Sequence, residues 1–241
     1  MNWSIGKISL RGRTEIVFII GAISAFLIPS VMPFAIGDSV NPGVFSIDAK
    51  PHGVTYGEWT ARWWQWVTSL PEEDNPNYDY TGEKCAIGQE GPVWYLAPTF
   101  GGSTERTCTM PAGKSILFPI LTSSCDYLSY PNIKTESDLL KCAMVGNEEG
   151  VMEASVDGVK LKDLQNYRIQ SGLFNITIPE NNVFGGPSGI SEAMVDGFFV
   201  FLEPLTPGRH EIHFAGSVVD NPTTGVQSYS TDVTYHLIVK P

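Results

Sequence analysis

The chain has 241 residues, a formal net charge of −11 at pH 7 and only 17% charged side chains. This length suits one sizeable domain behind a leader better than two domains, and the 24 glycines and 17 prolines suit a fold rich in turns and strands. An acidic surface repels phosphate backbones, which argues against nucleic acid as a partner.

The beginning of the chain has the pattern of a secretory leader. Lys7, Arg11 and Arg13 precede an apolar stretch at residues 16–36, in the order in which a signal peptide places its basic and apolar regions. Cleavage after the small residue Gly37 is favoured because prolines interrupt the apolar run, but a stretch of this length could also remain as a membrane anchor. We therefore expect an extracytoplasmic protein, either secreted or held in the cell envelope by its N-terminus.

We divide the chain into residues 1–37, the signal peptide or anchor, residues 38–54, an extended lead-in, and residues 55–241, a single domain. That domain begins with a helix at residues 55–71. Thr55 is a suitable N-cap, and Glu58 stands three residues later, where a capping box places an acid.

Four of the six tryptophans lie in this helix. At 100° per residue, one face carries the apolar side chains of Trp59, Trp63, Trp66, Val67 and Leu70. Trp64 lies between this face and the polar one. An aromatic face at helical spacing usually belongs to a core, and the alternative is an exposed patch that binds sugar rings or another protein.

The rest of the domain is expected to be rich in strands. An acidic loop follows the helix, and a second helix is predicted at residues 136–146, with Thr135 as its N-cap. Strands are predicted at residues 91–98, 107–109, 114–121, 153–156, 159–161, 173–178, 197–202, 209–218 and 228–239.

Two of these strand predictions carry more detail. Residues 114–121 are apolar on both faces, so this strand should be deeply buried, with Pro119 at a bulge or strand end. Asp157 and Gly158 tolerate the positive φ angles of a tight hairpin turn. Many short strands at this spacing indicate a mainly β fold, an antiparallel, jelly-roll-like β-sandwich with two short helices packed on it.

The four cysteines follow the leader and are even in number, which fits disulfides in an exported protein. We expect the pairs Cys85–Cys108 and Cys125–Cys142, because each closes a short local loop, and each should stabilise the fold by about 3 kcal/mol. A zinc site is less favoured, since there is no Cys-x-x-Cys pair. Asn175 begins an Asn-Ile-Thr glycosylation sequon, whose use the sequence does not decide.

A pattern of residues resembles a family of secreted bacterial and archaeal proteins that is uncharacterised. The pattern consists of Trp63-Trp64-Gln65-Trp66, Asn75-Pro76, Asp79, Thr81-Gly82, Cys85, Gly88-Gln89, Gly91-Pro92-Val93-Trp94, Arg106-Thr107-Cys108 and Pro111-Ala112-Gly113-Lys114. The likeness extends over most of residues 50–240, to the closing Val233–Leu237. It implies export and a shared fold, and it transfers no catalytic or binding residue.

Candidate chemistry centres on the polar side of the first helix. An acid paired with a cation beside tryptophans suits carbohydrate hydrolysis or lyase chemistry, so Glu58 with Arg62 or Asp79 is the catalytic candidate. Structural ion pairing is the favoured interpretation of the same residues. The candidate binding residues are Trp59, Trp63, Trp64, Trp66, Gln65, Gln89 and Arg106.

Metal sites and the common catalytic motifs receive little support. Asp74 and Asp79 are weak calcium candidates, but their spacing does not match an EF-hand loop. The sequence also lacks a nucleophile elbow, a zincin motif and a phosphate loop, and no cofactor is expected. The preferred hypothesis is a non-catalytic exported module that binds a glycan or another envelope protein or has a structural role. A carbohydrate-active enzyme is the alternative.

Overall fold

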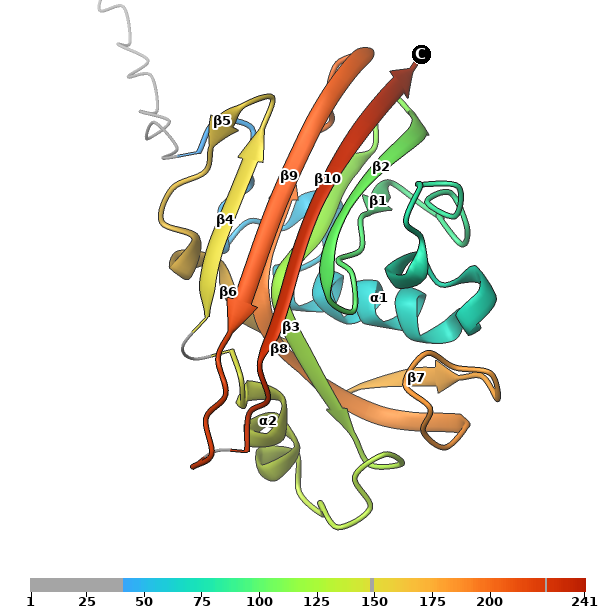
Figure 1. The fold of residues 1–241 in the computed structure, drawn as a ribbon, viewed down its shortest axis with the longest axis vertical. Helices are drawn as coiled ribbons and strands as arrows, with labels where there is room; N and C mark the ends of the chain where they lie inside the picture. Colours follow the sequence, from blue (N-terminus) through green and yellow to red (C-terminus); the bar gives the residue numbers. More distant parts are fainter. Residues whose placement is uncertain (1–40, 148–149, 224) are drawn as a thin grey trace, which may run out of the picture. The chain divides into compact units, whose positions relative to one another are not determined.

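The computed structural model describes residues 41–147, 150–223 and 225–241. The predicted leader, residues 1–37, lies outside these ranges. Within them the chain forms two β-sheets that pack on each other and two α-helices (Figure 1). The predicted β-sandwich with two helices is therefore confirmed.

Each of the two sheets contains five strands. Sheet A has the order β1-β3-β8-β6, with β7 also paired to β8. Its strands are β1 Val93–Tyr95, β3 Ser115–Asp126, β6 Arg168–Gln170, β7 Phe174–Ile178 and β8 Gly189–Leu202. Sheet B has the order β2-β10-β9-β4-β5. Its strands are β2 Gly102–Pro111, β4 Val151–Val156, β5 Val159–Lys160, β9 Gly208–Val218 and β10 Tyr229–Lys240.

Both sheets are mixed, whereas the sequence predicted antiparallel pairing. β1 runs parallel to β3, and β2 runs parallel to β10 along ten residue pairs, from Gly102–Thr231 to Pro111–Lys240. A tight hairpin can only produce antiparallel neighbours, but strands joined by a long connection are free to pair in parallel. β2 and β10 are far apart in the sequence, so their direction could not be read from local turns.

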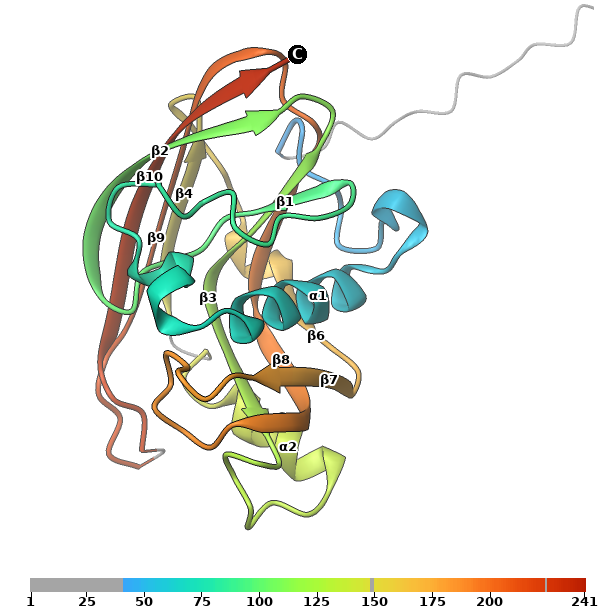
Figure 2. The same cartoon turned by 90° about the vertical axis from the view of Figure 1, so that its right-hand side faces the viewer.

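Strand β3 lies between two apolar layers. Ile116 and Phe118 face the core between the sheets, and Leu117 belongs to a second core on the opposite face of sheet A. The α1 helix, Tyr56–Ser69, covers that second face, on the side away from sheet B (Figure 2). The predicted deep strand is confirmed, and its pairing with β8 shifts between Pro119 and Leu121, as expected for a bulge.

Helix α1 forms for the reasons given by its sequence. The capping box is complete: the Glu58 amide donates to the Thr55 hydroxyl, and the Glu58 carboxylate accepts from the Thr55 amide at 3.0 Å. Leu70 has extended backbone angles, so the helix ends before Pro71. The second helix, α2 at Glu136–Met144, begins after Thr135 in the same way and packs on β3 and β8.

Several other elements differ in length from the predictions. β2 is ten residues long instead of three, because its inward positions include the polar Thr104 and Arg106, which interrupt the apolar alternation. β8 begins at Gly189, earlier than predicted, and the lead-in adds to sheet A through a hydrogen bond from the Phe45 amide to the Phe201 carbonyl (2.9 Å). The short 3-10 turns are Pro51–Gly53, Glu72–Asp74, Pro76–Tyr78 and Leu164–Tyr167.

Both predicted disulfides are present. Cys85–Cys108 ties the loop after α1 to β2, and Cys125–Cys142 ties the end of β3 to α2. Two such cross-links indicate folding in an oxidising compartment. The predicted hairpin turn is also confirmed, since Asp157 has φ 50° and Gly158 has φ 76°.

Candidate functional site

Three of the four indoles in α1 have a structural role. Their N–H groups donate to backbone carbonyls: Trp59 to Pro51 at 2.9 Å, Trp63 to Leu96 at 3.0 Å and Trp66 to Ile87 at 2.9 Å. All three rings are buried in the core between α1 and sheet A. A buried indole needs a hydrogen-bond acceptor, and here each indole N–H binds a carbonyl of a segment outside α1.

Trp64 has a different environment. Its indole N–H donates to the side-chain hydroxyl of Thr122 on β3 (3.1 Å), which in turn donates to the Asp196 carbonyl (3.2 Å). The ring of Phe184 stacks on it, with 6.3 Å between the ring centroids and 24° between the planes. Trp64 therefore belongs to the edge of the core, where α1, β3 and the loop after β7 meet.

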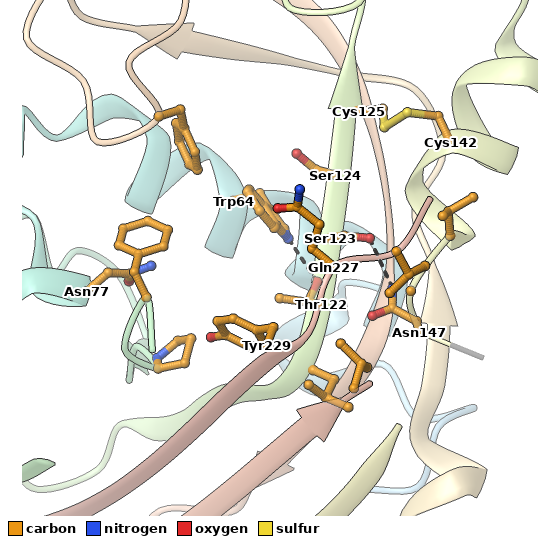
Figure 3. Close-up of a pocket in the computed structure, with 18 of the residues that line it drawn as sticks. Trp64, Asn77, Thr122, Ser123, Ser124, Cys125, Cys142, Asn147, Gln227 and Tyr229 are labelled. Atoms are coloured by element: carbon orange, nitrogen blue, oxygen red, sulfur yellow. Dashed lines mark hydrogen bonds between the residues drawn. A yellow bond between two sulfur atoms is a disulfide. The ribbon is translucent and has the colours of Figure 1, made fainter. Parts of the chain in front are cut away.

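Beside Trp64 lies an open hollow of about 490 Å³ (Figure 3). This volume is within the range of about 300–1,000 Å³ that is usual for small-molecule sites. Its wall contains side chains from α1, β3 and α2 and from the loops beside them. The main lining residues are Trp63, Trp64, Asn77, Phe100, Thr122, Ser123, Ser124, Tyr130, Asn147, Phe184, Gln227 and Tyr229.

The described lining of the hollow combines aromatic and uncharged polar side chains. It contains no Asp, Glu, Lys, Arg or His among the described residues. Two tyrosines, Tyr130 and Tyr229, belong to the lining. The Tyr229 hydroxyl donates to the Thr99 carbonyl at 2.5 Å, and burial raises the pKa of Tyr229. The phenol therefore stays neutral at physiological pH.

A row of aromatic rings leads from Trp64 to the surface. Phe184 contacts Phe100 edge to face at 5.9 Å, and Phe100 contacts Tyr78 at 5.0 Å. Phe100 is 39% exposed and Phe184 is 45% exposed. Exposed rings grouped around a concavity are a common feature of binding sites, so this row forms one wall of the hollow and its rim.

Several polar groups in the lining have no partner in the described part of the chain. Asn77 is only 6% exposed, and its amide oxygen is buried without a hydrogen bond. Ser124 and Gln227 also make no side-chain hydrogen bond with any described residue, and their side chains project toward the space beside Trp64 (Figure 3). More than nine in ten buried polar groups are paired. Of the described residues with a buried side-chain atom that lacks a hydrogen bond, Asn77, Trp94 and Arg168, Asn77 is the one that lines the hollow.

Two further polar side chains of the lining, those of Asn147 and Ser123, are hydrogen-bonded within the fold. The Asn147 side chain donates to the Asp196 carbonyl (2.9 Å) and to the Ser123 hydroxyl (3.2 Å). Ser123 donates to the Ala143 carbonyl. These bonds hold α2 against β8 and make one wall of the hollow rigid.

The catalytic candidates do not meet in the hollow. Glu58 binds the amide and hydroxyl of Thr55, and these hydrogen bonds hold the pKa of Glu58 below its usual value. Arg62 lies over the Trp59 ring, 4.5 Å from its centroid. Neither residue lines the hollow, and the same is true of Asp79.

Asp79 has a structural role in the acidic loop. Its carboxylate accepts hydrogen bonds from the amides of Thr81, Gly82 and Lys84. Partial burial acts to raise the pKa of Asp79, but these hydrogen bonds outweigh it and keep the pKa below its usual value. No group of three or more His, Cys, Asp or Glu side chains suited to a metal ion occurs in residues 41–147, 150–223 and 225–241. For the calcium candidates, Asp79 is committed to backbone amides and Asp74 lies in a short 3-10 turn.

Arg106 is completely buried and acts as a clamp. Its guanidinium donates to the carbonyls of Asp79 at 2.5 Å and Ala97 at 2.6 Å, and to the Tyr235 hydroxyl at 2.6 Å. Arginine suits this task because its planar group offers five donors. Through these hydrogen bonds, Arg106 joins the loop before β2 to β10.

The two glutamine candidates also hold the fold together. Gln89 brackets β1, accepting from the Tyr95 amide (2.9 Å) and donating to the Tyr95 carbonyl (2.8 Å). Gln65 donates to the Asn175 carbonyl on β7. Of the seven predicted binding residues, Trp63 and Trp64 line the hollow, and Trp64 is the one whose surroundings differ from a core.

The sequence interpretation missed Phe184, Phe100, Ser124, Gln227 and Tyr229 as lining residues. Two signals could have indicated part of this set. Phe184 stands in a loop of Asn, Gly and Pro, where a large aromatic has no strand or helix to bury it. Residues 122–124 are Thr-Ser-Ser directly after an apolar run, which marks the point where β3 leaves the core.

No helix in the part of the chain that the structure describes is both long and apolar enough to cross a membrane. The stretch at residues 16–36 lies outside that part. The sequence matches no protein-family model and no curated protein.

Proposed function

We propose that this protein is an exported, non-catalytic binding protein whose ligand occupies the hollow beside Trp64. The observation that carries this proposal is the composition of the described lining, which combines exposed aromatic rings with polar side chains that have no hydrogen-bond partner among the described residues and contains no Asp, Glu, Lys, Arg or His. Concave sites that are mostly apolar, with a few polar groups directed inward, are typical of ligand binding.

Export is part of the same proposal. The basic and apolar regions of the first 37 residues support a signal peptide or an N-terminal anchor, and the two disulfides agree with an oxidising compartment. We also propose that the chain belongs to the uncharacterised secreted family that its sequence resembles. The proposed partner is a glycan or another envelope protein. Mass spectrometry of the mature N-terminus tests cleavage: a chain that begins at Met1 or Asn2 contradicts it.

A carbohydrate-active enzyme has less support. Hydrolysis of a glycosidic bond by the common mechanism needs two carboxyl groups on either side of that bond. The carboxylates of Glu58 and Asp79 are instead engaged with Thr55 and with the backbone of the acidic loop, and the described lining of the hollow contains no Asp or Glu. Binding without chemistry is therefore the better interpretation of the hollow.

The indole N–H signals of the full chain provide a test of the binding site. Neutral sugars, aromatic alcohols and short peptides are titrated as probes, and a bound probe should shift the signal that disappears in Trp64→Phe. The matched control is Trp59→Phe, which alters an indole of the same helix outside the hollow. Trp59→Phe should bind the probe normally, and Trp64→Phe should bind it more weakly. A probe that shifts Trp59 or Trp94 and leaves Trp64 unchanged contradicts the proposed site.

A further inference from the structure

We propose that the ligand is a neutral sugar ring, a hexose or N-acetylhexosamine unit of a glycan. It would contact the Phe184 and Phe100 rings and receive hydrogen bonds from, or donate them to, Asn77, Ser124 and Gln227. This inference rests on the proposed function and specifies the ligand of the same hollow.

The charge of the site selects a neutral ligand. An anionic sugar, such as a uronic acid or a sulfated unit, would find no cation in the described lining and would approach a chain of net charge −11. A cationic ligand would find no carboxylate there. Removing either charge from water without a partner is strongly unfavourable.

The hydrogen-bonding groups select a hydroxylated ligand over a purely apolar one. The Asn77 side chain belongs to the wall of the hollow and makes no hydrogen bond with any described residue. Its amide can pair with a sugar hydroxyl, whereas an apolar ligand would leave it unpaired. The Ser124 hydroxyl, which both donates and accepts, and the Gln227 amide add further positions on the same hollow. Three unpaired polar side chains suit a ring that carries several hydroxyls.

The aromatic rings select a ring with a face of C–H bonds. Phe100 and Phe184 stand at 87° to each other, so they form a corner at the mouth of the hollow. The face of an aromatic ring carries partial negative charge, which attracts the weakly positive C–H groups on one side of a pyranose. The sugar can thus place its C–H face on a ring and its hydroxyls toward Asn77.

Asn77 offers a test that separates a binding role from a structural one. Because its side chain makes no hydrogen bond within the described chain, Asn77→Ala removes an unpaired buried group and should leave the thermal unfolding midpoint unchanged or raise it. If Asn77 served the fold, the same substitution would lower the midpoint. Loss of binding without loss of stability is therefore the expected signature.

The experiment uses the full chain on an array of neutral, uronic-acid and sulfated oligosaccharides, followed by calorimetry with the strongest neutral binder. We expect neutral glycans alone to bind, and Asn77→Ala and Phe184→Ala each to weaken binding about tenfold. The matched controls are Asn175→Ala, an exposed asparagine outside the hollow, and Tyr80→Ala, an aromatic that is 60% exposed outside it. Both controls should bind within about twofold of the unaltered protein.

The possible failures differ in meaning. Binding of charged glycans in preference to neutral ones overturns the ligand class. Binding of the apolar dye ANS or of aromatic alcohols at Trp64, with no neutral glycan bound, overturns the sugar inference and leaves the proposed binding site standing. If no probe of any class perturbs Trp64, both the inference and the proposed function are overturned. Equal weakening by the controls and by Asn77→Ala also overturns the inference.

Discussion

Trp63 and Trp64 are neighbours on one helix, belong to one buried cluster and both line the hollow, yet the surroundings of the two indoles differ. Trp63 is 1% exposed, donates to the Leu96 carbonyl and contacts Phe199, Trp64 and Trp66 edge to face. Trp64 donates to a hydroxyl and borders the open hollow, where Phe184 covers part of its ring. Trp63 is held within what we call the sealed core, the aromatic cluster between α1 and sheet A, and Trp64, at 8% exposure, lies where this core borders the open hollow.

The two regions differ in how many of their polar groups are hydrogen-bonded within the fold. The indoles of the sealed core are paired with backbone carbonyls, so nothing is left for a ligand. The wall of the hollow contains three side chains, those of Asn77, Ser124 and Gln227, that make no hydrogen bond with any described residue. The number of aromatic residues does not distinguish the two regions. The number of polar groups that lack a hydrogen-bond partner does.

The largest effect is expected from the sealed core. Trp63→Ala should lower the free energy of unfolding by about 3–5 kcal/mol, because it opens a cavity and leaves the Leu96 carbonyl unpaired. Urea unfolding followed by circular dichroism measures this loss. A loss below about 1.5 kcal/mol would mean that the core can collapse around the gap and is less tightly packed than described.

The two disulfides differ in whether they line the hollow. Replacing both members of either pair by alanine should cost about 3 kcal/mol, since the closed loops are of similar length, with separations of 23 and 17 residues. Only the Cys125–Cys142 pair lines the hollow, so only its removal should also weaken ligand binding. Calorimetry on both double variants checks this, and equal weakening by loss of Cys85–Cys108 would contradict it.

Trp64→Phe should have a smaller effect on stability than Trp63→Ala and a larger effect on binding. It keeps an aromatic ring and removes one hydrogen bond, that to Thr122, whose hydroxyl still donates to the Asp196 carbonyl. The expected loss is about 1 kcal/mol. Urea unfolding and ligand titration of the same sample give both values, and a loss near that of Trp63→Ala would place Trp64 in the sealed core.

The smallest effect concerns pH and His210 on β9. Partial burial acts to lower the pKa of His210. The hydrogen bonds to Asp157 (2.8 Å) and to the Thr206 carbonyl, together with the charge of Asp157, outweigh this effect, so the pKa of His210 is raised. A raised pKa in the folded state means that this stabilisation is present below the usual value near 6.5 and is lost as pH rises through the folded-state value. The loss should stay below about 1 kcal/mol.

Unfolding midpoints between pH 5.5 and 8.5 measure this change, and His210→Gln should flatten it. Ligand affinity should not change over the same range, since the described lining of the hollow has no group that titrates there. An affinity that follows the titration would show that an ionisable group reaches the ligand after all.

The features that the sequence predicted are local ones. The capping box at Thr55 and Glu58, the buried face of α1, the Asp157–Gly158 turn and both disulfides could be inferred because each depends on residues close together in the chain. Helical and strand periodicity, capping and short loop closure follow from the backbone itself. The mainly β sandwich followed from the same local signals.

Only the tertiary structure decided the parallel pairings and the hollow. Trp64 of α1 meets Thr122 of β3, Phe184 of the loop after β7 and Gln227 before β10 because distant strands pair in one register. No pattern within one segment states which other segment it will lie against, since that choice depends on the packing of the whole core. For this reason the sequence by itself determined that tryptophans gather on α1, and the fold determined that Trp64 faces an open site.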